Sequence, residues 1–183
     1  MPSIFAVKID GIVAYIVCML RKTYQLELCV TEEGSQHYPA VGTVEELSSD
    51  NAGYDLKVVV KQTPVTTASL VPLGVKARMV CRTVLSVGVT EEECHFSLEP
   101  RSSIYKSGFM MANGRGIIDK SYRGQLMAPM ISVGSTFKSV EAGTRLFQIL
   151  APDMGYIDKV TYVSELKELK GSVRGSGGFG STG

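Results

Sequence analysis

The final ten residues, "RGSGGFGSTG" (174–183), combine groups that bind anions and aromatic bases. Glycines leave consecutive backbone N–H groups open to an anion, and an arginine such as Arg174 can hold a phosphate with two hydrogen bonds. Gly180, Ser181 and Thr182 add backbone and hydroxyl donors, while Phe179 offers a flat face on which a nucleobase can stack. This combination favours a segment that folds over a nucleoside triphosphate.

Familiar glycine-rich nucleotide motifs do not describe this tail. "GSGGFG" (175–180) matches the dinucleotide-binding pattern by letter, but that motif needs a strand before it and a helix after it. The P-loop pattern would also need a lysine and a following helix. Nine of the thirteen residues at 171–183 are Gly or Ser, so ordering them costs more backbone entropy than one phenyl ring returns. We expect an arm that is mobile until a ligand binds, with a flexible terminus that binds nothing as the alternative.

Four further stretches place polar side chains next to strand-like runs. Asp55 begins a strand within "NAGYDL" (51–56), and "EPRSSIYKSG" (99–108) has an arginine and two hydroxyls after one. "NGRGIIDKSYRGQL" (113–126) has a glycine-containing turn, an acid and then a tyrosine, while "AGTRLFQIL" (142–150) has two polar residues in an apolar strand. Each alone has an ordinary explanation: a capping acid, a hairpin turn, a barrel tyrosine or a structural ion pair. Together with the tail they favour a nucleotide site.

The elements that must position these residues are mostly strands. Turn-forming clusters, "TEEE" (90–93) among them, separate the strand-like runs. The best helix candidate is "SELKELK" (164–170), with Ser164 as its cap. The pattern predicts an all-β domain, sandwich or barrel. Strands are expected near residues 4–9, 24–30, 54–60, 76–85, 94–100, 125–133 and 145–150.

Composition excludes several classes of function. The chain has 183 residues, 44% of them hydrophobic, which suits one domain with a core and a tail. Lys plus Arg number 19 and Asp plus Glu 18, so a broad surface for nucleic acid is not expected. The longest apolar run, residues 11–20, is too short for a membrane span and is not placed like a secretory signal.

The cysteines indicate a reducing compartment. Cys18, Cys29, Cys81 and Cys94 form no CxxC pair, and only two histidines accompany them, so neither a zinc site nor a disulfide framework is expected. We therefore expect an intracellular protein, cytoplasmic or nuclear. Because the charges balance and the longest apolar run is short, we expect no nucleic-acid or membrane partner.

Taken in order, the four stretches and the tail resemble the five motifs of the homotrimeric dUTPase family (deoxyuridine 5′-triphosphate nucleotidohydrolases). The resemblance covers about residues 50–183; each motif is weak alone, but the set is specific. It implies a jelly-roll-like β-barrel with a flexible glycine-rich C-terminal arm, a homotrimer, and Mg²⁺-dependent hydrolysis of dUTP to dUMP and pyrophosphate. Such an activity limits uracil incorporation into DNA and supplies dUMP for dTMP synthesis.

The same resemblance implies a division of the chain. Residues 1–170 would form the barrel domain, and 171–183 the mobile arm, which in this family closes over an active site of a neighbouring subunit. "IFAVKID" (4–10) resembles the family's first strand. Residues 11–36 resemble an insertion, for which an extra hairpin is the simplest explanation.

Roles on the nucleoside side follow from the third motif and the tail. Asp119 matches the acid that positions and activates the attacking water, and Tyr122 matches the aromatic that packs under the deoxyribose and rejects UTP. Phe179 would stack on the base. The uracil edge would be recognised by a hairpin and an adjacent strand, namely Asn113, Gly116, Ile117, Ile118 and Met127.

Roles on the phosphate side follow from the other motifs. Asp55 matches the acid that holds Mg²⁺ through water, since most of the metal's ligands would come from the triphosphate and water. Ser103 stands where the family more often has glycine, which weakens the inference of a backbone contact there. Arg145 has a structural ion pair as its alternative role. The predicted phosphate-binding set is Arg101, Ser102, Ser103, Gln148, Arg174, Gly180, Ser181 and Thr182.

Two other functions remain as alternatives. The dCTP deaminases share the fold and a similar "RSS" stretch, but that family has an arginine where Lys106 stands and a catalytic glutamate where Pro129 stands. A non-catalytic trimer that senses nucleotides or binds a partner would keep the barrel without turnover. Asp119, Tyr122 and Phe179 together favour catalysis.

Overall fold

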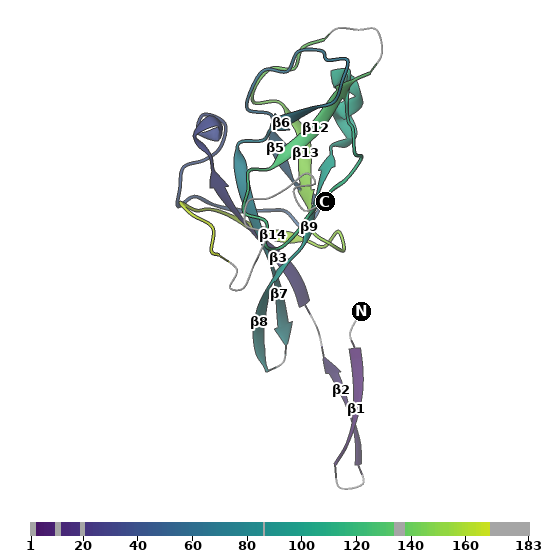
Figure 1. Cartoon of the computed structure of the whole chain (residues 1–183). Helices are drawn as coiled ribbons and strands as arrows, with labels where there is room; N and C mark the ends of the chain where they lie inside the picture. Colours follow the sequence, from purple (N-terminus) through teal and green to yellow (C-terminus); the bar gives the residue numbers. More distant parts are fainter. Residues whose placement is uncertain (1–2, 10–11, 19–20, 86, 134–137, 169–183) are drawn as a thin grey trace.

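The described part of the chain consists mostly of β-strands (Figure 1). The structure, a computed structural model, describes residues 3–9, 12–18, 21–85, 87–133 and 138–168. Within these ranges the only helices are two short 3-10 turns, η1 (Glu32–Gly34) and η2 (Ser102–Ser107). The prediction of an all-β, jelly-roll-like fold is confirmed. None of the described helices is long and apolar enough to cross a membrane.

Three sheets form the body of the molecule (Figure 1). The largest has the strand order β4 (Val44–Glu46), β14 (Ile157–Tyr162), β3 (Arg21–Val30), β7 (Val75–Leu85) and β8 (Gly88–Cys94). The second has the order β11 (Gly116–Ile118), β9 (Phe96–Pro100), β13 (Arg145–Leu150) and β5 (Gly53–Lys57). The third is β10 (Phe109–Met111), β12 (Met127–Ser132) and β6 (Ser69–Pro72). Neighbouring strands run antiparallel, except for the parallel pair β14 and β3.

Alternation along the strands builds the core between these sheets. On β3, Tyr24, Leu26 and Leu28 are at most 1% exposed, while Gln25 and Glu27 between them are only partly buried. Fully burying one large apolar side chain is worth about 1.5–3 kcal/mol. A shift of one residue would turn all three apolar side chains out of the core, so the pattern fixes the register of β3.

The first two strands form a hairpin of their own. β1 (Ser3–Ile9) pairs along its length with β2 (Ile12–Cys18), and among the described residues neither pairs with another strand. The segment 11–36, which resembled an insertion, is therefore divided. Its first part belongs to this hairpin, and its second part contains β3, at the centre of the five-stranded sheet. Thus β3, and not β1, contributes to the body of the fold.

The helix predicted over residues 164–170 is wrong as far as the structure describes it, because residues 164–168 form no helix. Leu166 is buried, and the Lys167 carbonyl accepts a hydrogen bond of 2.8 Å from Nε of Arg123. This tertiary contact thus satisfies a carbonyl that the short predicted helix would have left without a partner inside the helix.

The turn predicted at residues 90–93 is also wrong, because these residues lie within β8. Glu91 lies 3.4 Å from Nε of Arg82, and Oε1 of Glu93 lies 2.7 Å from Nε of Arg78, both on the neighbouring β7. Cross-strand ion pairs supply the contacts that an acidic run would otherwise lack. Charged side chains are also typical of an edge strand, which β8 is.

Candidate active site

One hollow of about 470 Å³ brings together four of the residues predicted to lie on the phosphate and metal side. Asp55 on β5 and Gln148 on β13 are direct cross-strand partners, so their side chains leave the sheet on the same face. Arg101 follows the end of β9, and Ser102 begins η2. The remaining lining residues are Leu47, Asp50, Asn51, Ala52, Gly53, Tyr54 and Arg145.

The Asp55 carboxylate lies between two arginines. Nε of Arg101 is 2.7 Å from Oδ1, and Nη1 of Arg145 is 3.4 Å from Oδ2. Nη1 of Arg101 also donates to the Arg145 carbonyl at 3.2 Å, which ties the end of β9 to the start of β13. Each guanidinium has five N–H donors, so these contacts leave donors for phosphate oxygens. The arrangement suits a phosphate chain that enters beside the carboxylate.

A glycine makes room for the amide of Gln148. A Cβ at Gly53 would lie 2.8 Å from the Ile149 carbonyl oxygen and 3.1 Å from Oε1 of Gln148, both tighter than normal contact. Nε2 of Gln148 donates to the Pro100 carbonyl at 3.3 Å. The amide is therefore held from one side by the backbone, and a Cβ at position 53 would crowd Leu150 and the Ile149 carbonyl most and would press on the Gln148 amide as well.

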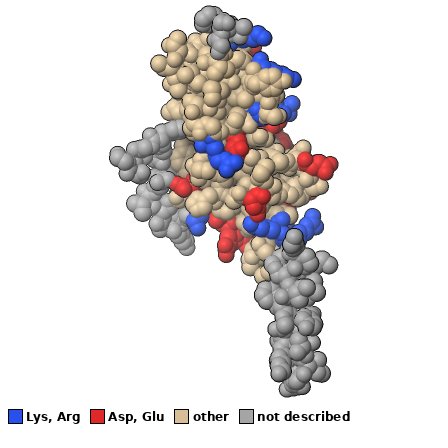
Figure 2. All heavy atoms as spheres, turned by 90° about the vertical axis from the view of Figure 1, so that its right-hand side faces the viewer, with Lys and Arg blue, Asp and Glu red and all other residues tan. Residues whose placement is uncertain are grey.

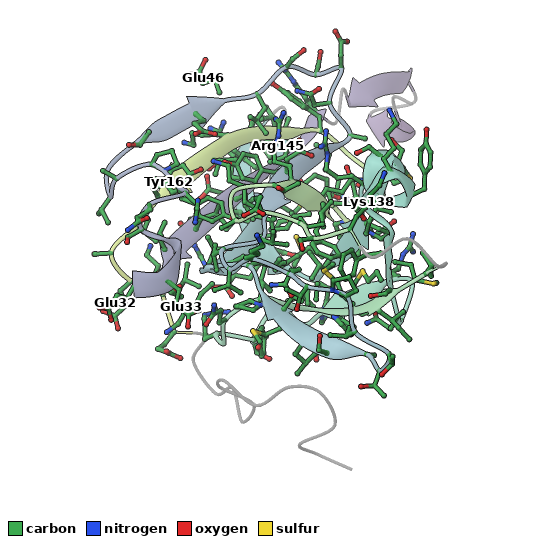
Figure 3. All side chains as sticks on the ribbon, turned by 90° about the horizontal axis from the view of Figure 1, so that it is seen from above. Glu32, Glu33, Glu46, Lys138, Arg145 and Tyr162 are labelled. Atoms are coloured by element: carbon green, nitrogen blue, oxygen red, sulfur yellow. The ribbon has the colours of Figure 1, made fainter. Side chains whose placement is uncertain are left out.

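Ser103 does not line this hollow. It faces a neighbouring one of about 380 Å³, which it shares with Lys106, Lys138 and Arg145. Figure 3 shows Lys138 beside η2 and Arg145 nearer the middle of the molecule. Arg145 borders both hollows. It makes an ion pair with Asp55, which was its alternative role, and it also lines the hollow that contains Asp55. Its sequence signal was a charge at the start of an apolar strand.

The segment predicted as a base-recognising hairpin is a turn between β10 and β11, and the hairpin itself is wrong, because these strands lie in different sheets and pair with β12 and β9. The backbone N–H of Gly114 donates to the Met111 carbonyl at 3.2 Å, and that of Arg115 donates to the Asn113 carbonyl at 2.7 Å. Gly114 has a φ of 68°, a left-handed conformation that glycine adopts without strain. Ile117, on β11 beyond the turn, is 68% exposed, so this short strand offers its edge and an apolar side chain to a ligand or a neighbouring molecule.

A tight turn follows β11 and carries Asp119 and Tyr122. The Tyr122 N–H donates to the Asp119 carbonyl at 2.9 Å, and the Tyr122 hydroxyl donates to the Gln125 carbonyl at 2.9 Å. Burial raises the pKa of Tyr122 above its ordinary value. Oδ1 of Asp119 is 3.4 Å from Nδ1 of His95, which also accepts the Lys120 N–H at 3.2 Å.

The structure does not bring the two halves of the predicted site together within one chain. β11 and β5 are the opposite edges of the four-stranded sheet, with β9 and β13 between them. Three strand spacings amount to about 14 Å. Of the predicted base and sugar residues that the structure describes, none lines the hollow that contains Asp55, and Met127 lies in a different sheet, on β12. Within one chain, the residues predicted to bind the phosphates (the phosphate half) therefore lie apart from the described residues predicted to bind the nucleoside (the nucleoside half).

Five predicted residues lie outside the described part of the chain: Arg174, Phe179, Gly180, Ser181 and Thr182. Within the described part, no group of three or more His, Cys, Asp or Glu side chains could hold a metal ion. Asp55 is the predicted metal-side residue in the hollow. Asp50 is the other carboxylate that lines this hollow. So small a set of carboxylates fits an ion held mainly by substrate oxygens and water, as Mg²⁺ commonly is.

Comparison with known proteins decides the family. The dUTPase family profile matches residues 43–183. This chain belongs to the dUTPase family. The deoxyuridine 5′-triphosphate nucleotidohydrolase of Leptospira interrogans is 35% identical over 136 residues, covering 72% of this chain and 84% of that protein. The enzyme of the same name from Escherichia phage T5 is 34% identical over 137 residues, covering 74% and 88%.

A solved dUTPase structure supports the fold of this family member. The crystal structure of the Streptococcus mutans dUTPase superposes with a TM-score of 0.50 at 23% identity, over 78% of this chain and 99% of that one. The profile match begins at residue 43, after the hairpin β1–β2 and after β3. Every residue predicted for the site lies within the matched range.

Proposed function

We propose that this protein hydrolyses dUTP to dUMP and pyrophosphate with Mg²⁺, at sites assembled between the subunits of a homotrimer. The observation that carries the proposal is the hollow over β5, β9 and β13, where Asp55, Arg101 and Gln148 converge, in a chain of the dUTPase family. The arginine donors suit the phosphates, and the segment 113–122 suits the nucleoside.

In this mechanism the protein contributes mainly position and charge. Arg101 and Arg145 hold phosphate oxygens and offset their negative charge. Asp119 accepts a proton from the attacking water and directs the water at the α-phosphorus. When bound, Mg²⁺ neutralises charge on the triphosphate, and Asp55 would hold it through water. The arm at 171–183 would close over the nucleotide and exclude bulk water.

Two observations support a site shared between subunits. None of the described residues predicted to bind the nucleoside lines the hollow that holds Asp55, Arg101 and Gln148, so a second chain would complete the site. The outer face of the three-stranded sheet is also apolar: Met110 is paired with Ile131, and Leu70 is paired with Pro129. Met110 and Leu70 are 46% and 47% exposed in the single chain.

Such an apolar face is typical of a surface that another subunit covers. Figure 2 shows a broad uncharged area over the upper part of the body, the end where β6 and β12 lie in Figure 1, with Lys and Arg side chains along its right-hand edge. A homotrimer would bury apolar surface and complete the three sites at the same time.

The first test measures pyrophosphate release from dUTP, dCTP, dTTP and UTP with Mg²⁺. The proposal predicts strong release from dUTP alone, and loss of turnover in Asp119→Asn with nucleotide binding retained. Ammonia release from dCTP would instead support the deaminase alternative. Nucleotide binding without any turnover in the folded wild-type protein would support the sensor alternative and contradict the proposal.

A further inference from the structure

The imidazole of His95 lies beside the turn that carries Asp119. β11 pairs with β9 so that Ile118 faces Phe96, and the same register places Asp119 opposite His95, one residue beyond the paired strands. Oδ1 of Asp119 is 3.4 Å from Nδ1 of His95. The backbone N–H of Lys120 donates to the same nitrogen at 3.2 Å. A single ring nitrogen therefore contacts both the proposed reacting carboxylate and the backbone that follows it.

These two contacts need different protonation states of the ring. Nδ1 accepts the Lys120 N–H only while it carries no proton, and the proton of the neutral ring is then on Nε2. Once Nδ1 is protonated it can only donate, and the Asp119 carboxylate is the acceptor beside it. The His95 side chain is 58% exposed, so water reaches it. Imidazole is the side chain that ordinarily changes charge between about pH 5 and 8, and protonation of His95 exchanges one contact for the other.

Other titratable groups on the adjoining segments do not compete for the imidazole. Glu93, near the end of β8, forms ion pairs with two arginines, and Glu99 on β9 forms one with a third. Burial raises the pKa of the Cys94 thiol to about 11, so this group stays neutral. The exposed Lys120 ammonium lies on the turn itself and would repel a protonated ring. Among the described residues, the acid that pairs with the imidazole is Asp119.

Each protonation state has its own effect on the proposed reaction. With Nδ1 unprotonated, the Lys120 N–H is held directly after the residue that aims the attacking water, and the Tyr122 N–H closes the same turn onto the Asp119 carbonyl at 2.9 Å. With Nδ1 protonated, the Lys120 N–H loses this acceptor and a cation stands beside the carboxylate. A carboxylate next to a cation binds a proton less readily, so Asp119 becomes a weaker base toward water. Both changes slow turnover.

We propose that His95 is a positioning residue for Asp119 and that it supports turnover only while its Nδ1 is unprotonated. This inference rests on the proposed dUTP hydrolysis and adds a group that sets the lower pH limit of the reaction. His95 precedes β9 and lies outside the stretches that resemble the family's motifs, so no motif in the sequence pointed to it.

The kinetic test uses the full chain and three substitutions. His95→Asn places an amide oxygen about where Nδ1 lies, so the Lys120 N–H keeps an acceptor that does not titrate. His95→Ala removes both the acceptor and the titrating group. His37→Asn is the matched control: it replaces the other of the two histidines, whose backbone carbonyl, and not its ring, accepts a hydrogen bond from Lys57. The kcat for dUTP at saturating Mg²⁺ is measured from about pH 5.5 to about pH 8.

We expect the ratio of kcat for His95→Asn to kcat for wild type to rise about tenfold as the pH falls from about 8 to about 5.5, because an ordinary imidazole is about nine-tenths protonated at the lower value. Taking the ratio cancels any titration of the substrate. At about pH 8, His95→Asn should stay within about twofold of wild type, whereas His95→Ala should lose about fivefold, the factor that corresponds to one ordinary hydrogen bond. His37→Asn should follow wild type at every pH.

Nitrogen-15 NMR of the imidazoles tests the protonation state without turnover. In an untagged His37→Asn protein the remaining imidazole is that of His95, so its signals need no further assignment. At about pH 8 we expect the Nδ1 signal of an unprotonated ring nitrogen and the Nε2 signal of a protonated one. A proton on Nδ1 at this pH would overturn the inference, because the contact with the Lys120 N–H would then be excluded.

Different failures separate the two proposals. A folded wild-type protein that hydrolyses no dUTP at any pH would overturn the proposed function. Normal hydrolysis by wild type, with a ratio of kcat for His95→Asn to wild type that stays constant with pH, would overturn this inference alone. Equal kcat values for His95→Ala and His95→Asn at the higher pH would overturn the positioning part. A lower melting temperature of the His95 variants with an unchanged pH profile would make His95 a structural residue and refute the inference.

Discussion

Substitution of Gly124 by alanine tests whether Tyr122 sets the preference for the deoxyribose. An alanine Cβ would lie 2.6 Å from Cζ and 2.9 Å from Cε2 of the Tyr122 ring, where ordinary contact begins at 3.4 Å. The ring must therefore recede by about 0.8 Å. The phenol is held by its hydrogen bond to the Gln125 carbonyl at 2.9 Å, so this contact is strained or lost.

The magnitude follows from these contacts. Losing one hydrogen bond costs about 1 kcal/mol of stability, and crowding a packed ring adds about 1–3 kcal/mol. A ring that recedes leaves space for the 2′-hydroxyl of UTP and supports dUTP less well. Because a misplacement of about 1 Å can cost on the order of 100-fold in rate, we expect the ratio of kcat/KM for dUTP to that for UTP to fall by about tenfold or more.

Steady-state kinetics with both nucleotides, alongside thermal unfolding, provide the assay. Gly155→Ala is the matched control, because its Cβ would lie 2.6 Å from Oδ1 of Asp153 and would also crowd the Tyr24 ring, without touching the proposed site. It should lower the melting temperature and leave the nucleotide ratio unchanged. A folded Gly124→Ala protein whose ratio stays within twofold of wild type would refute the role of Tyr122. So would an equal loss of selectivity in Gly155→Ala.

Other perturbations test the rest of the site. Folding lowers the pKa of Glu93 below its unfolded value, so the ionised carboxylate stabilises the fold above about pH 4.3. This stabilisation is lost as the pH falls toward the pKa in the folded state. The urea midpoint of wild type should therefore fall more steeply below about pH 5 than that of Glu93→Gln. Asp55→Asn should raise the Mg²⁺ concentration for half-maximal activity by about tenfold, since a water-mediated carboxylate contact is lost, and an unchanged Mg²⁺ titration would count against that role. Met110→Lys should shift sedimentation from trimer toward monomer, because it places a charge in the apolar face between subunits; a stable trimer would exclude this face as an interface. Truncation after Val173 should leave the assembly intact and remove most dUTP hydrolysis, whereas full activity would contradict closure by the arm.

Local patterns in the chain predicted much of the fold. Alternating apolar residues such as those of β3 can be recognised in the sequence because a strand buries every second side chain. The motif residues were also recognisable, because glycine turns, arginines and acids at fixed spacing have few other uses in combination. The acidic strand β8 was not predicted, since its partners Arg78 and Arg82 lie on another strand and its own residues favour turns.

By itself, the sequence determined the all-β class and the family, because these depend on local periodicity and on motifs of a few residues each; the residues of the site stay a prediction from the same motifs. Only the tertiary structure decided that Asp55 lies between Arg101 and Arg145, since cross-strand pairing of β5 and β13 creates that contact. It also decided that residues 164–168 form no helix; there Leu166 is buried and the Lys167 carbonyl accepts a hydrogen bond from Arg123. Contacts between residues far apart in the chain depend on how strands pair and pack, and no local pattern encodes that.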